Sequence, residues 1–495
     1  MASFFLIGHF TLLLLLCVYG CHRIYLTRVY LRTRRAPPVV DDDGGPPPRV
    51  TVQLPLYNEK YVVERLVAAA VALRYPPDRL QIQVLDDSTD ETRDLAAALV
   101  AAHRRQGVDI EYLHRSERRG FKAGALARGL ARARGELVAV FDADFVPPPD
   151  LLLAVVPAFR DPRIGMVQAR WTHLNREVST VTQVQAMMLD AHFVIEHGAR
   201  CNAGLCFNFN GTAGLWRTAA IRDAGGWQSD TLTEDLDLSY RAQLRGWRFL
   251  FLPEVTCAGE LPVEITAFKS QQHRWAKGAT QVMLKLLPRI WRSALPRRAK
   301  VEATFHLSSN VAYLLMVLDS LFFLLPSVVI RYRLGWWPTF WIDAPLFLFA
   351  TVSHLYFFAT AQQALYGTLR GRRRYLPGLL SLGVGLGLNN ARAVAEALLG
   401  RASEFVRTPK LGPHALRGAR AVVRGAYRVE LHGWEFVEIA AGAAYAVFTA
   451  WAIHRGLWLA VPFLVLFLNG FLATGVCSLW AVSYTHLTLP TNREV

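Results

Sequence analysis

Hydrophobic residues are distributed unevenly along this chain, and that distribution constrains the fold more than any other feature. Long apolar runs stand at the start of the 495 residues and after about residue 304, and short alternating runs lie between them. An apolar run of about 20 residues can span a bilayer as a helix. Short β-rich runs that alternate with helical stretches indicate an α/β domain. We therefore expect a soluble α/β domain inserted between membrane-spanning helices.

The apolar runs predict five spans, together with interfacial helices. The segment 376–399 is also apolar, but it contains Asn389, Arg392 and Glu396. Charged groups are costly inside a bilayer, so we expect this segment to lie at the interface. Polar residues inside the spans are candidates either to line a channel or to pair between helices. The expected spans lie within 1–22 and at about 307–330, 344–366, 434–454 and 457–480; the intramembrane polar residues are Asn310, Asp319, His354, Gln362 and Gln363.

The net charge of +16 does not indicate nucleic-acid binding, because the basic residues cluster beside the apolar runs. Basic residues flank membrane helices on the cytoplasmic side, so we predict a multi-pass membrane protein with a cytoplasmic soluble domain. No zinc-ligand spacing or basic recognition helix is visible in the sequence. The six cysteines contain no C-x-x-C pair, which argues against a disulfide framework and fits a reducing compartment.

Composition divides the chain into six expected segments. The first helix is followed by a basic, proline-rich linker, and a soluble domain then leads into interfacial helices and a membrane domain. The last 13 residues share no character with the helix before them, and we expect them to be foreign to the protein. The expected segments are 1–22, 23–48, 49–265, 266–306, 307–482 (with a loop at 403–412) and 483–495.

Acidic residues follow the predicted strands of the soluble domain. In a parallel sheet, ligands bind beyond the carboxyl ends of the strands. Asp142 and Asp144 come directly after the apolar run LVAVF, and their alternating carboxylates suit a hard cation such as Mg²⁺ or Mn²⁺. In isolation, such aspartates can equally cap the next helix. Asn58, Glu59, Asp86 and Asp87 follow the two preceding strands of this kind.

A second acidic cluster, Thr233-Glu234-Asp235, opens a helical segment. Read alone, it could be only a helix cap, but Asp235 is the best candidate for a general base in the chain. Gln271-Gln272-His273-Arg274-Trp275 lies on an amphipathic stretch just before the membrane domain. An arginine offers a fork of donors to a diphosphate, and a tryptophan ring provides a platform for a sugar, although both residues also anchor interfacial helices.

Seven motifs follow one another over about residues 50–280. They are LPLYNE (54–59), QVLDDSTD (83–90), RRGFKAGAL (118–126), DADF (142–145), FNGTAGLWR (209–217), TEDLDLSYR (233–241) and QQHRW (271–275). In this order, the motifs resemble those of the family 2 inverting glycosyltransferases of the cellulose synthase type, and especially of the mannan and glucomannan synthase-like members.

The resemblance implies a GT-A-like fold with a mixed, mainly parallel sheet, and it implies a role for each motif. The nucleotide sugar would contact Tyr57, Glu59, Asp87, Lys122, Asp142 and Arg274. The metal would be held by Asp142 and Asp144, and catalysis would rest on Asp235 as base with Glu234 beside it. The acceptor would be held by Gln271 and Trp275. Phe405, Thr408 and Lys410 resemble a gating loop, although Arg407 departs from that pattern.

The sequence therefore predicts an enzyme, a processive inverting glycosyltransferase that builds a β-linked glucan, mannan or glucomannan. Its expected partners are a nucleotide sugar (UDP-glucose or GDP-mannose), a growing glycan or lipid acceptor, and membrane lipid. The sequence does not choose between the donors, and an oligomer or accessory subunits stay open. Two alternatives remain at this point: a glycolipid glucosyltransferase acting on ceramide or diacylglycerol, and a membrane scaffold that has lost catalysis.

Overall fold

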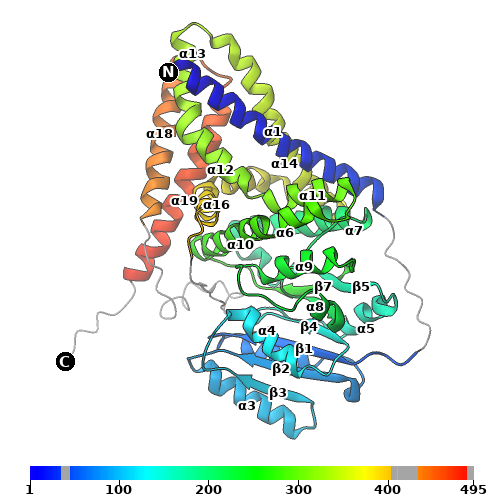
Figure 1. The fold of residues 1–495 in the computed structure, drawn as a ribbon. Coiled ribbons are helices and arrows are strands. Elements are labelled where there is room, and N and C mark those ends of the chain that lie inside the picture. Colours follow the sequence, from blue (N-terminus) through cyan, green and yellow to red (C-terminus); the bar gives the residue numbers. More distant parts are fainter. Residues whose placement is uncertain (35–44, 403–409, 411–432, 488–495) are drawn as a thin grey trace, which may run out of the picture.

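The computed structural model describes residues 1–34, 45–402, 410 and 433–487. Its parts form three layers: a sheet domain, a layer of interfacial helices, and a bundle of long helices (Figure 1). The amino terminus lies at the end of the bundle far from the sheet, and α1 (Ala2–Thr33) runs from there toward the sheet domain.

The sheet has seven strands in the order β3-β2-β1-β4-β6-β5-β7. Neighbours are parallel from β3 to β4, β6 runs antiparallel to both of its neighbours, and β5 pairs with β7 in parallel. This is the expected mixed, mainly parallel sheet of a GT-A-like fold. The strands are β1 (Val50–Leu56), β2 (Leu80–Asp86), β3 (Ile110–His114), β4 (Leu137–Val140), β5 (Ile164–His173), β6 (Gly214–Arg217) and β7 (Arg248–Gly259).

Hydrophobic spacing explains how the helices cover this sheet. In α2 (Val63–Val71), the buried residues Val63, Leu66, Val67 and Ala70 recur every three or four positions, which gives one apolar face. Strands β1 and β4 are buried along almost their whole length, as expected for strands covered on both faces. Other helices of the domain are α3 (Thr92–Arg105), α4 (Phe121–Arg132), α5 (Leu151–Val155), α8 (Thr218–Asp223) and α9 (Glu234–Leu244).

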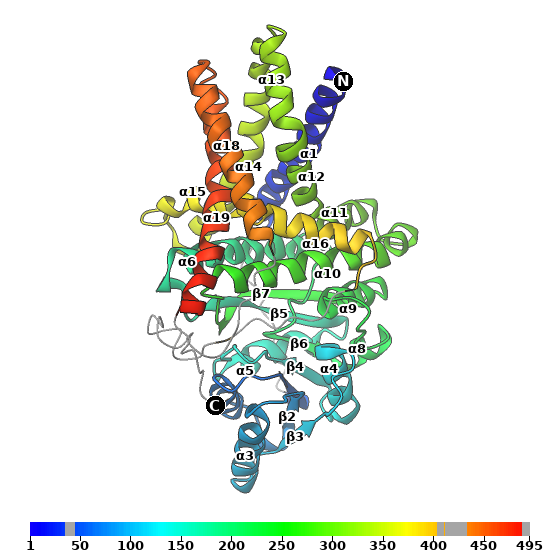
Figure 2. The ribbon, with the colours of Figure 1, turned by 90° about the vertical axis from the view of Figure 1, so that its left-hand side faces the viewer.

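Interfacial helices separate the sheet from the bundle (Figure 2). The longest is α10 (Ile265–Arg292), against which α16 (Gly387–Leu398) packs. A buried contact unites α10 with the bundle, because Lys269 Nζ lies 2.7 Å from Glu438 Oε1. The rest of the layer comprises α6 (Thr180–Ala191), the π-helical η4 (His192–His197), α7 (Gly198–Asn202), α11 (Arg297–Ser308) and α15 (Leu376–Gly385).

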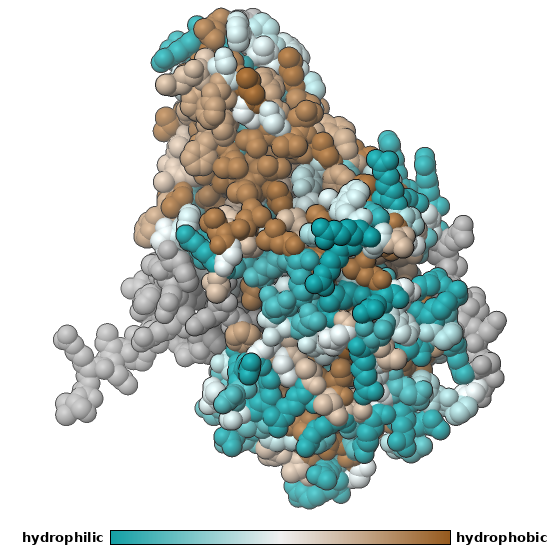
Figure 3. Space-filling model, viewed as in Figure 1, coloured by the Kyte–Doolittle hydropathy of each residue, from teal (hydrophilic) through white to brown (hydrophobic). Residues whose placement is uncertain are grey.

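In the described part of the chain, five helices are long and apolar enough to cross a membrane, which agrees with the predicted number of spans. On the face that Figure 3 shows, the surface of the bundle is mostly hydrophobic, whereas that of the sheet domain is largely hydrophilic. A π-helical turn, η5 (Asp319–Leu324), interrupts the second span, which no periodicity predicted. The spans are Ala2–Thr33, Val311–Arg333, Phe340–Tyr366, Trp434–His454 and Val461–Trp480, formed by α1, α12 (Val311–Leu318) to α13 (Leu325–Arg333), α14 (Phe340–Tyr366), α18 (Trp434–His454) and α19 (Val461–Leu487).

Two intramembrane polar residues serve as partners between elements. Asp319 Oδ1 lies 2.8 Å from Nδ1 of His9 on α1. Gln362 donates to Asp190 of α6 over 2.8 Å. Helix α19 continues to Leu487, five residues into the segment expected to be foreign, and residues 488–495 lie outside the described part of the chain.

Candidate active site

The loops after β1 and β2 are tied together beyond the strand ends. Asn58 adopts a left-handed conformation (φ +56°), and its backbone N–H donates to Ser88 Oγ over 2.8 Å. The Asn58 side-chain oxygen accepts the N–H of Thr89 at 2.9 Å. Asparagine tolerates this backbone region better than most residues, which explains its presence in the first loop. The two loops therefore form one wall of the candidate site.

The residues predicted for the nucleoside pocket lie on this wall beside two arginines. Arg118 stacks over the Tyr57 ring, 3.4 Å from its centroid. The guanidinium of Arg115 engages both oxygens of Asp87, with Nε at 2.7 Å from Oδ1. Glu59 is buried at the end of the same loop. An aromatic ring and fixed charges next to it suit a base and ribose, and the two arginines were not singled out from the sequence.

Asp86, although it ends a strand, has a structural role. Its carboxylate is fully buried and accepts hydrogen bonds from the Tyr112 hydroxyl at 2.6 Å and from the Ser88 N–H at 3.0 Å. His114 Nδ1 lies 3.2 Å from the same group. Asp86 therefore connects β2 to β3, and of the two neighbouring aspartates only Asp87 contributes to the wall of the site.

Lys122, Asp142 and the loop 208–212 meet at the centre of the site. Lys122 Nζ lies 2.5 Å from Asp142 Oδ1 and donates to the Gly211 carbonyl over 2.9 Å. Gly211 has a φ of +83°, and a Cβ there would lie 2.9 Å from Asp235 Oδ2. Asp235 Oδ1 accepts the N–H of Leu236 at 2.8 Å. Glycine is thus required both by the backbone and by the close approach of the candidate base.

Burial and like charges shape the electrostatics of this centre. Burial, followed by repulsion from Glu234, raises the pKa of Asp235 to about 7. Burial also raises the pKa of Glu234. Burial opposes the charge of Lys122, but attraction to the surrounding carboxylates, Asp142 first, outweighs it and raises the pKa of the ammonium. A carboxylate that titrates near neutrality is suited to proton transfer.

Asp144, the second carboxylate of the DADF motif, is buried and faces a lysine from the predicted gating loop. Lys410 Nζ lies 2.6 Å from Asp144 Oδ2. Each aspartate of the motif therefore has a lysine beside it, Lys122 at Asp142 and Lys410 at Asp144. Carboxylates are also the hard oxygen ligands that Mg²⁺ and Mn²⁺ prefer. Among the described residues, no group of three or more potential ligands is assembled, so the residues fit a metal only if a donor diphosphate adds further oxygens.

The helix α10 carries the QQHRW motif past this centre. Burial lowers the pKa of the Arg274 guanidinium, and four site carboxylates act against that change: Glu234, Asp142, Asp235 and Asp144. Trp275 packs against the core of the sheet domain, and Gln271 is half-buried on the same helix. Gly278 allows the helix to approach Thr233 closely, since a Cβ there would lie 2.5 Å from Thr233 Cγ2.

The capping interpretation of the second acidic cluster does not describe this structure. Thr233 is the N-cap residue of α9, but its side chain makes no capping hydrogen bond among the described residues. Asp237 is the structural member of the cluster, because it is buried between Arg241, at 2.8 Å, and Lys285, at 2.9 Å. Asp235 is left to face Gly211 and the centre of the site.

Sequence reasoning left several neighbours of the site unidentified. Arg65 lies 2.6 Å from Glu260, and burial raises the pKa of this glutamate. The partner of Lys410 was also unforeseen. Phe405 and Thr408, the other predicted gating residues, lie outside the described residues. None of these pairings leaves a local sequence pattern, because each joins residues far apart in the chain.

The mixed sheet and the cluster of carboxylates beyond its strand ends define a nucleotide-sugar glycosyltransferase of GT-A-like fold. Residues 47–278 match the family described as glycosyltransferase like family 2. The chain is 33% identical over 402 residues to glucomannan 4-beta-mannosyltransferase 1 of Oryza sativa subsp. japonica, which covers 79% of this chain and 74% of that protein. The chain therefore belongs to the family 2 glycosyltransferases, in their cellulose synthase-like branch.

Other relatives match over a shorter length. Glucomannan 4-beta-mannosyltransferase 2 of Arabidopsis thaliana is 44% identical over 249 residues, which is 49% of this chain and 47% of that protein. This match spans about half the length of that relative. A mannosyltransferase from Pyrobaculum calidifontis, solved with GDP-Man and Mn²⁺, has a TM-score of 0.51 and 20% identity, covering 79% of this chain and 99% of that one. At this identity the likeness shows the fold.

Proposed function

We propose that this protein is a processive, inverting hexosyltransferase that extends a β-linked polysaccharide from a nucleotide sugar, with GDP-mannose as the first donor to test. The observation that carries the proposal is the position of Asp235 beside Lys122, Asp142 and Gly211. Asp235 is a half-buried carboxylate whose pKa is raised by desolvation to about 7. The choice of donor is supported by the relatives named as glucomannan 4-beta-mannosyltransferases.

The reaction is a single in-line displacement. The acceptor oxygen forms a bond to the anomeric carbon while the bond from that carbon to the diphosphate breaks. The acceptor proton passes to Asp235, whose Oδ2 faces Gly211 while Oδ1 is held by the Leu236 N–H. The bonding electrons leave with the nucleoside diphosphate, and an α-linked donor gives a β-linked product.

The cations of the site would stabilise the departing diphosphate. Lys122 stands beside Asp142, and Arg274 experiences the field of all four carboxylates. Asp142 and Asp144 would hold a Mg²⁺ or Mn²⁺ ion, which when bound would neutralise charge on the leaving group. Tyr57, Glu59 and Asp87 would contact the nucleoside, and Gln271 with Trp275 would hold the terminal sugar of the acceptor.

We also propose that the catalytic domain faces the cytoplasm. Arg28 and Arg32 lie at the end of α1 next to the sheet domain, and Arg370 follows the end of α14 on the same side. Basic residues at these ends are what the positive-inside rule expects of a cytoplasmic face. The donor would therefore be taken from the cytoplasm, and the glycan would have the membrane domain as its exit.

The test is transfer of radiolabelled mannose or glucose by inverted membrane vesicles that contain the protein, with Mg²⁺ or Mn²⁺ supplied. We expect label from GDP-mannose in insoluble or high-molecular-weight material that a β-mannanase releases. Label from UDP-glucose would instead assign a glucan synthase. Label confined to the organic extract would overturn processive synthesis in favour of a glycolipid enzyme, and no transfer from either donor would contradict the proposed function.

A further inference from the structure

The loop 208–212 touches three of the residues proposed for transfer. Its Gly211 carbonyl accepts the Lys122 ammonium at 2.9 Å, and Gly211 lies against Asp235 Oδ2. The Thr212 hydroxyl oxygen accepts the backbone N–H of Asp142 at 2.9 Å. A small displacement of this loop would therefore disturb the base, the lysine and the metal-site aspartate together. What fixes the loop bears directly on catalysis.

Helix α9 holds one side of the loop. The Ser239 hydroxyl oxygen accepts the N–H of Phe209 at 2.9 Å and donates to the Asp235 carbonyl at 2.5 Å. Gln243 accepts the Phe207 N–H at 3.2 Å and donates to the Phe207 carbonyl at 2.8 Å. These bonds tie the segment leading into the loop to α9, the helix that carries the candidate base.

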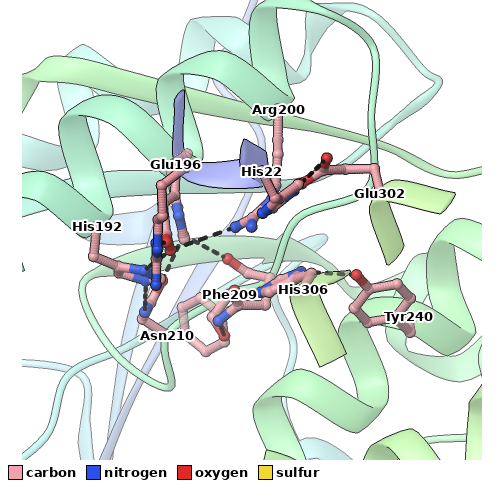
Figure 4. Close-up of polar contacts among 12 residues, drawn as sticks. His22, His192, Glu196, Arg200, Phe209, Asn210, Tyr240, Glu302 and His306 are labelled. Atoms are coloured by element: carbon pink, nitrogen blue, oxygen red, sulfur yellow. Dashed lines mark hydrogen bonds and ion pairs between the residues drawn. The ribbon is translucent and has the colours of Figure 1, made fainter. Parts of the chain in front are cut away.

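On the other side of the loop, two histidines of the π-helical turn η4, His192 and His197, contact the side-chain amide of Asn210. Figure 4 shows His192 beside Asn210. Asn210 Nδ2 lies 2.9 Å from His192 Nε2, and Asn210 Oδ1 lies 2.6 Å from His197 Nε2. His197 Nε2 is also 3.0 Å from the Asn208 carbonyl. A π-helical turn changes the direction of the side chains along a helix, which brings both rings to the same amide.

The partners of the two rings determine their tautomers. His192 Nδ1 lies 2.7 Å from the Glu196 carboxylate, so it carries the proton, and Nε2 accepts from the Asn210 amide. His197 Nε2 faces two oxygens and must donate. Burial lowers the pKa of His197 to about 3 and that of His192 well below its usual value, so both rings are neutral. The Asn210 amide therefore has one orientation, in which its N–H donates to His192 Nε2 and its oxygen accepts the His197 N–H.

The contacts of His192 and His197 with Asn210, here called the clamp, connect to further polar contacts that reach the first span. Glu196, which accepts a hydrogen bond from His192 Nδ1, is also ion-paired with Arg23 of α1. Arg200 lies 3.6 Å from Glu196 and 3.0 Å from Glu302 of α11, and Glu302 lies 2.9 Å from His22 of α1. A connected set of polar contacts, most of them partly buried, thus runs from the first span to the loop 208–212.

We propose that Asn210 is a positioning residue for sugar transfer: clamped by His192 and His197, its amide holds the loop 208–212 in place against Lys122 and Asp235. This inference rests on the proposed function. It predicts that loosening the clamp lowers kcat by a larger factor than it raises the KM for the donor. The loop contacts Asp235, Lys122 and Asp142, whereas the predicted nucleoside contacts lie on other loops.

The test compares Asn210→Ala, His197→Leu and His197→Gln. A glutamine amide can donate to Asn210 and Asn208 as the imidazole N–H does, whereas leucine cannot. We expect kcat per nucleotide-binding site to fall at least about tenfold in Asn210→Ala and His197→Leu, in line with the cost of misplaced reacting groups. His197→Gln should recover most of the activity.

Asp190→Asn is the matched control, because Asp190 is an equally buried tie between α6 and the span α14 that does not contact the loop. Amide hydrogen exchange of residues 205–217 is measured in every variant and does not depend on transfer. Faster exchange with lower kcat in Asn210→Ala and His197→Leu, but not in the control, is the expected result. Unchanged exchange in His197→Leu, or an equal loss of kcat in Asp190→Asn, would overturn the clamp. Wild-type protein that transfers no sugar while its clamp variants still exchange faster would overturn the proposed function instead.

Discussion

A substitution of Gly211, compared with one of Gly204, distinguishes two effects of an added methyl group: backbone strain, and crowding of the candidate base Asp235. Gly211→Ala adds a methyl group 2.9 Å from Asp235 Oδ2 at a φ of +83°. Gly204 is the matched control, since its φ is +67° and a Cβ there would meet nothing within 4 Å. Both substitutions should lower stability by about 1–2 kcal/mol through backbone strain, but only Gly211→Ala should abolish transfer. Thermal melts and initial rates check this. Equal activity in the two variants would show that Gly211 is needed only for its conformation.

The raised pKa of Asp235 predicts the pH dependence of transfer. The base works only when deprotonated, so the rate should fall as pH drops through its pKa, and burial places that fall near pH 7 rather than near the usual value of about 4. Glu234→Gln removes the neighbouring negative charge and should move the acid limb to lower pH. The measurement is the transfer rate at saturating donor between pH 5 and 9. Below the pKa of the base, this rate should fall on the order of tenfold per pH unit. An acid limb at the same pH in Glu234→Gln as in the wild-type protein would contradict the assignment of Asp235 as the base.

For single residues, the sequence predicted which side chains belong to the site better than it predicted which side chains contact each other. Asp142, Asp144, Glu234, Asp235 and Arg274 were predicted together, and the structure brings their charges into one field. The contact of Lys410 with Asp144 and the clamp on Asn210 were not predicted. A motif reports which side chains are present, whereas these contacts depend on how distant loops approach each other.

The ion pair between α10 and α18 stabilises the docking of the catalytic layer on the bundle. Lys269 and Glu438 are both buried, and their charged groups lie 2.7 Å apart. Glu438→Ala should destabilise the protein by about 3–5 kcal/mol, because it removes the carboxylate that compensates a buried ammonium. The double variant Lys269→Met/Glu438→Leu should recover most of this loss, since apolar residues of similar volume can replace a buried pair. Thermal unfolding in detergent measures both, and a double variant no more stable than the single one would refute the pair's role.

Among the elements, the long and strongly patterned ones were predictable. The span Trp434–His454 has the expected bounds, because the length of an apolar run reports a span directly. The π-helical turns at His192–His197 and Asp319–Leu324 were not predicted. Their hydrophobic pattern is that of an ordinary helix, and the extra residue per turn is stabilised by tertiary contacts such as the clamp on Asn210.

For the whole molecule, the proposed orientation predicts which loops reagents can reach. Arg104, exposed on α3 of the sheet domain, and Arg333, exposed at the far end of α13, would lie on opposite sides of the membrane. Arg104→Cys should react with a membrane-impermeant maleimide in inverted vesicles only, and Arg333→Cys in right-side-out vesicles only, each above the wild-type background. Labelling in the reverse vesicles would place the catalytic domain outside the cytoplasm.

The role of Asp235 as general base is tested by comparing sugar transfer by wild-type protein and by Asp235→Asn in the same membranes, with nucleotide affinity and thermal stability measured alongside. Loss of a general base should lower the rate by about 10²–10⁴-fold. Nucleotide affinity should be retained. Stability should not fall, because desolvation raises the pKa of Asp235 and so disfavours its negative charge in the folded state. Transfer at an undiminished rate in Asp235→Asn would contradict the assignment of this carboxylate as the base.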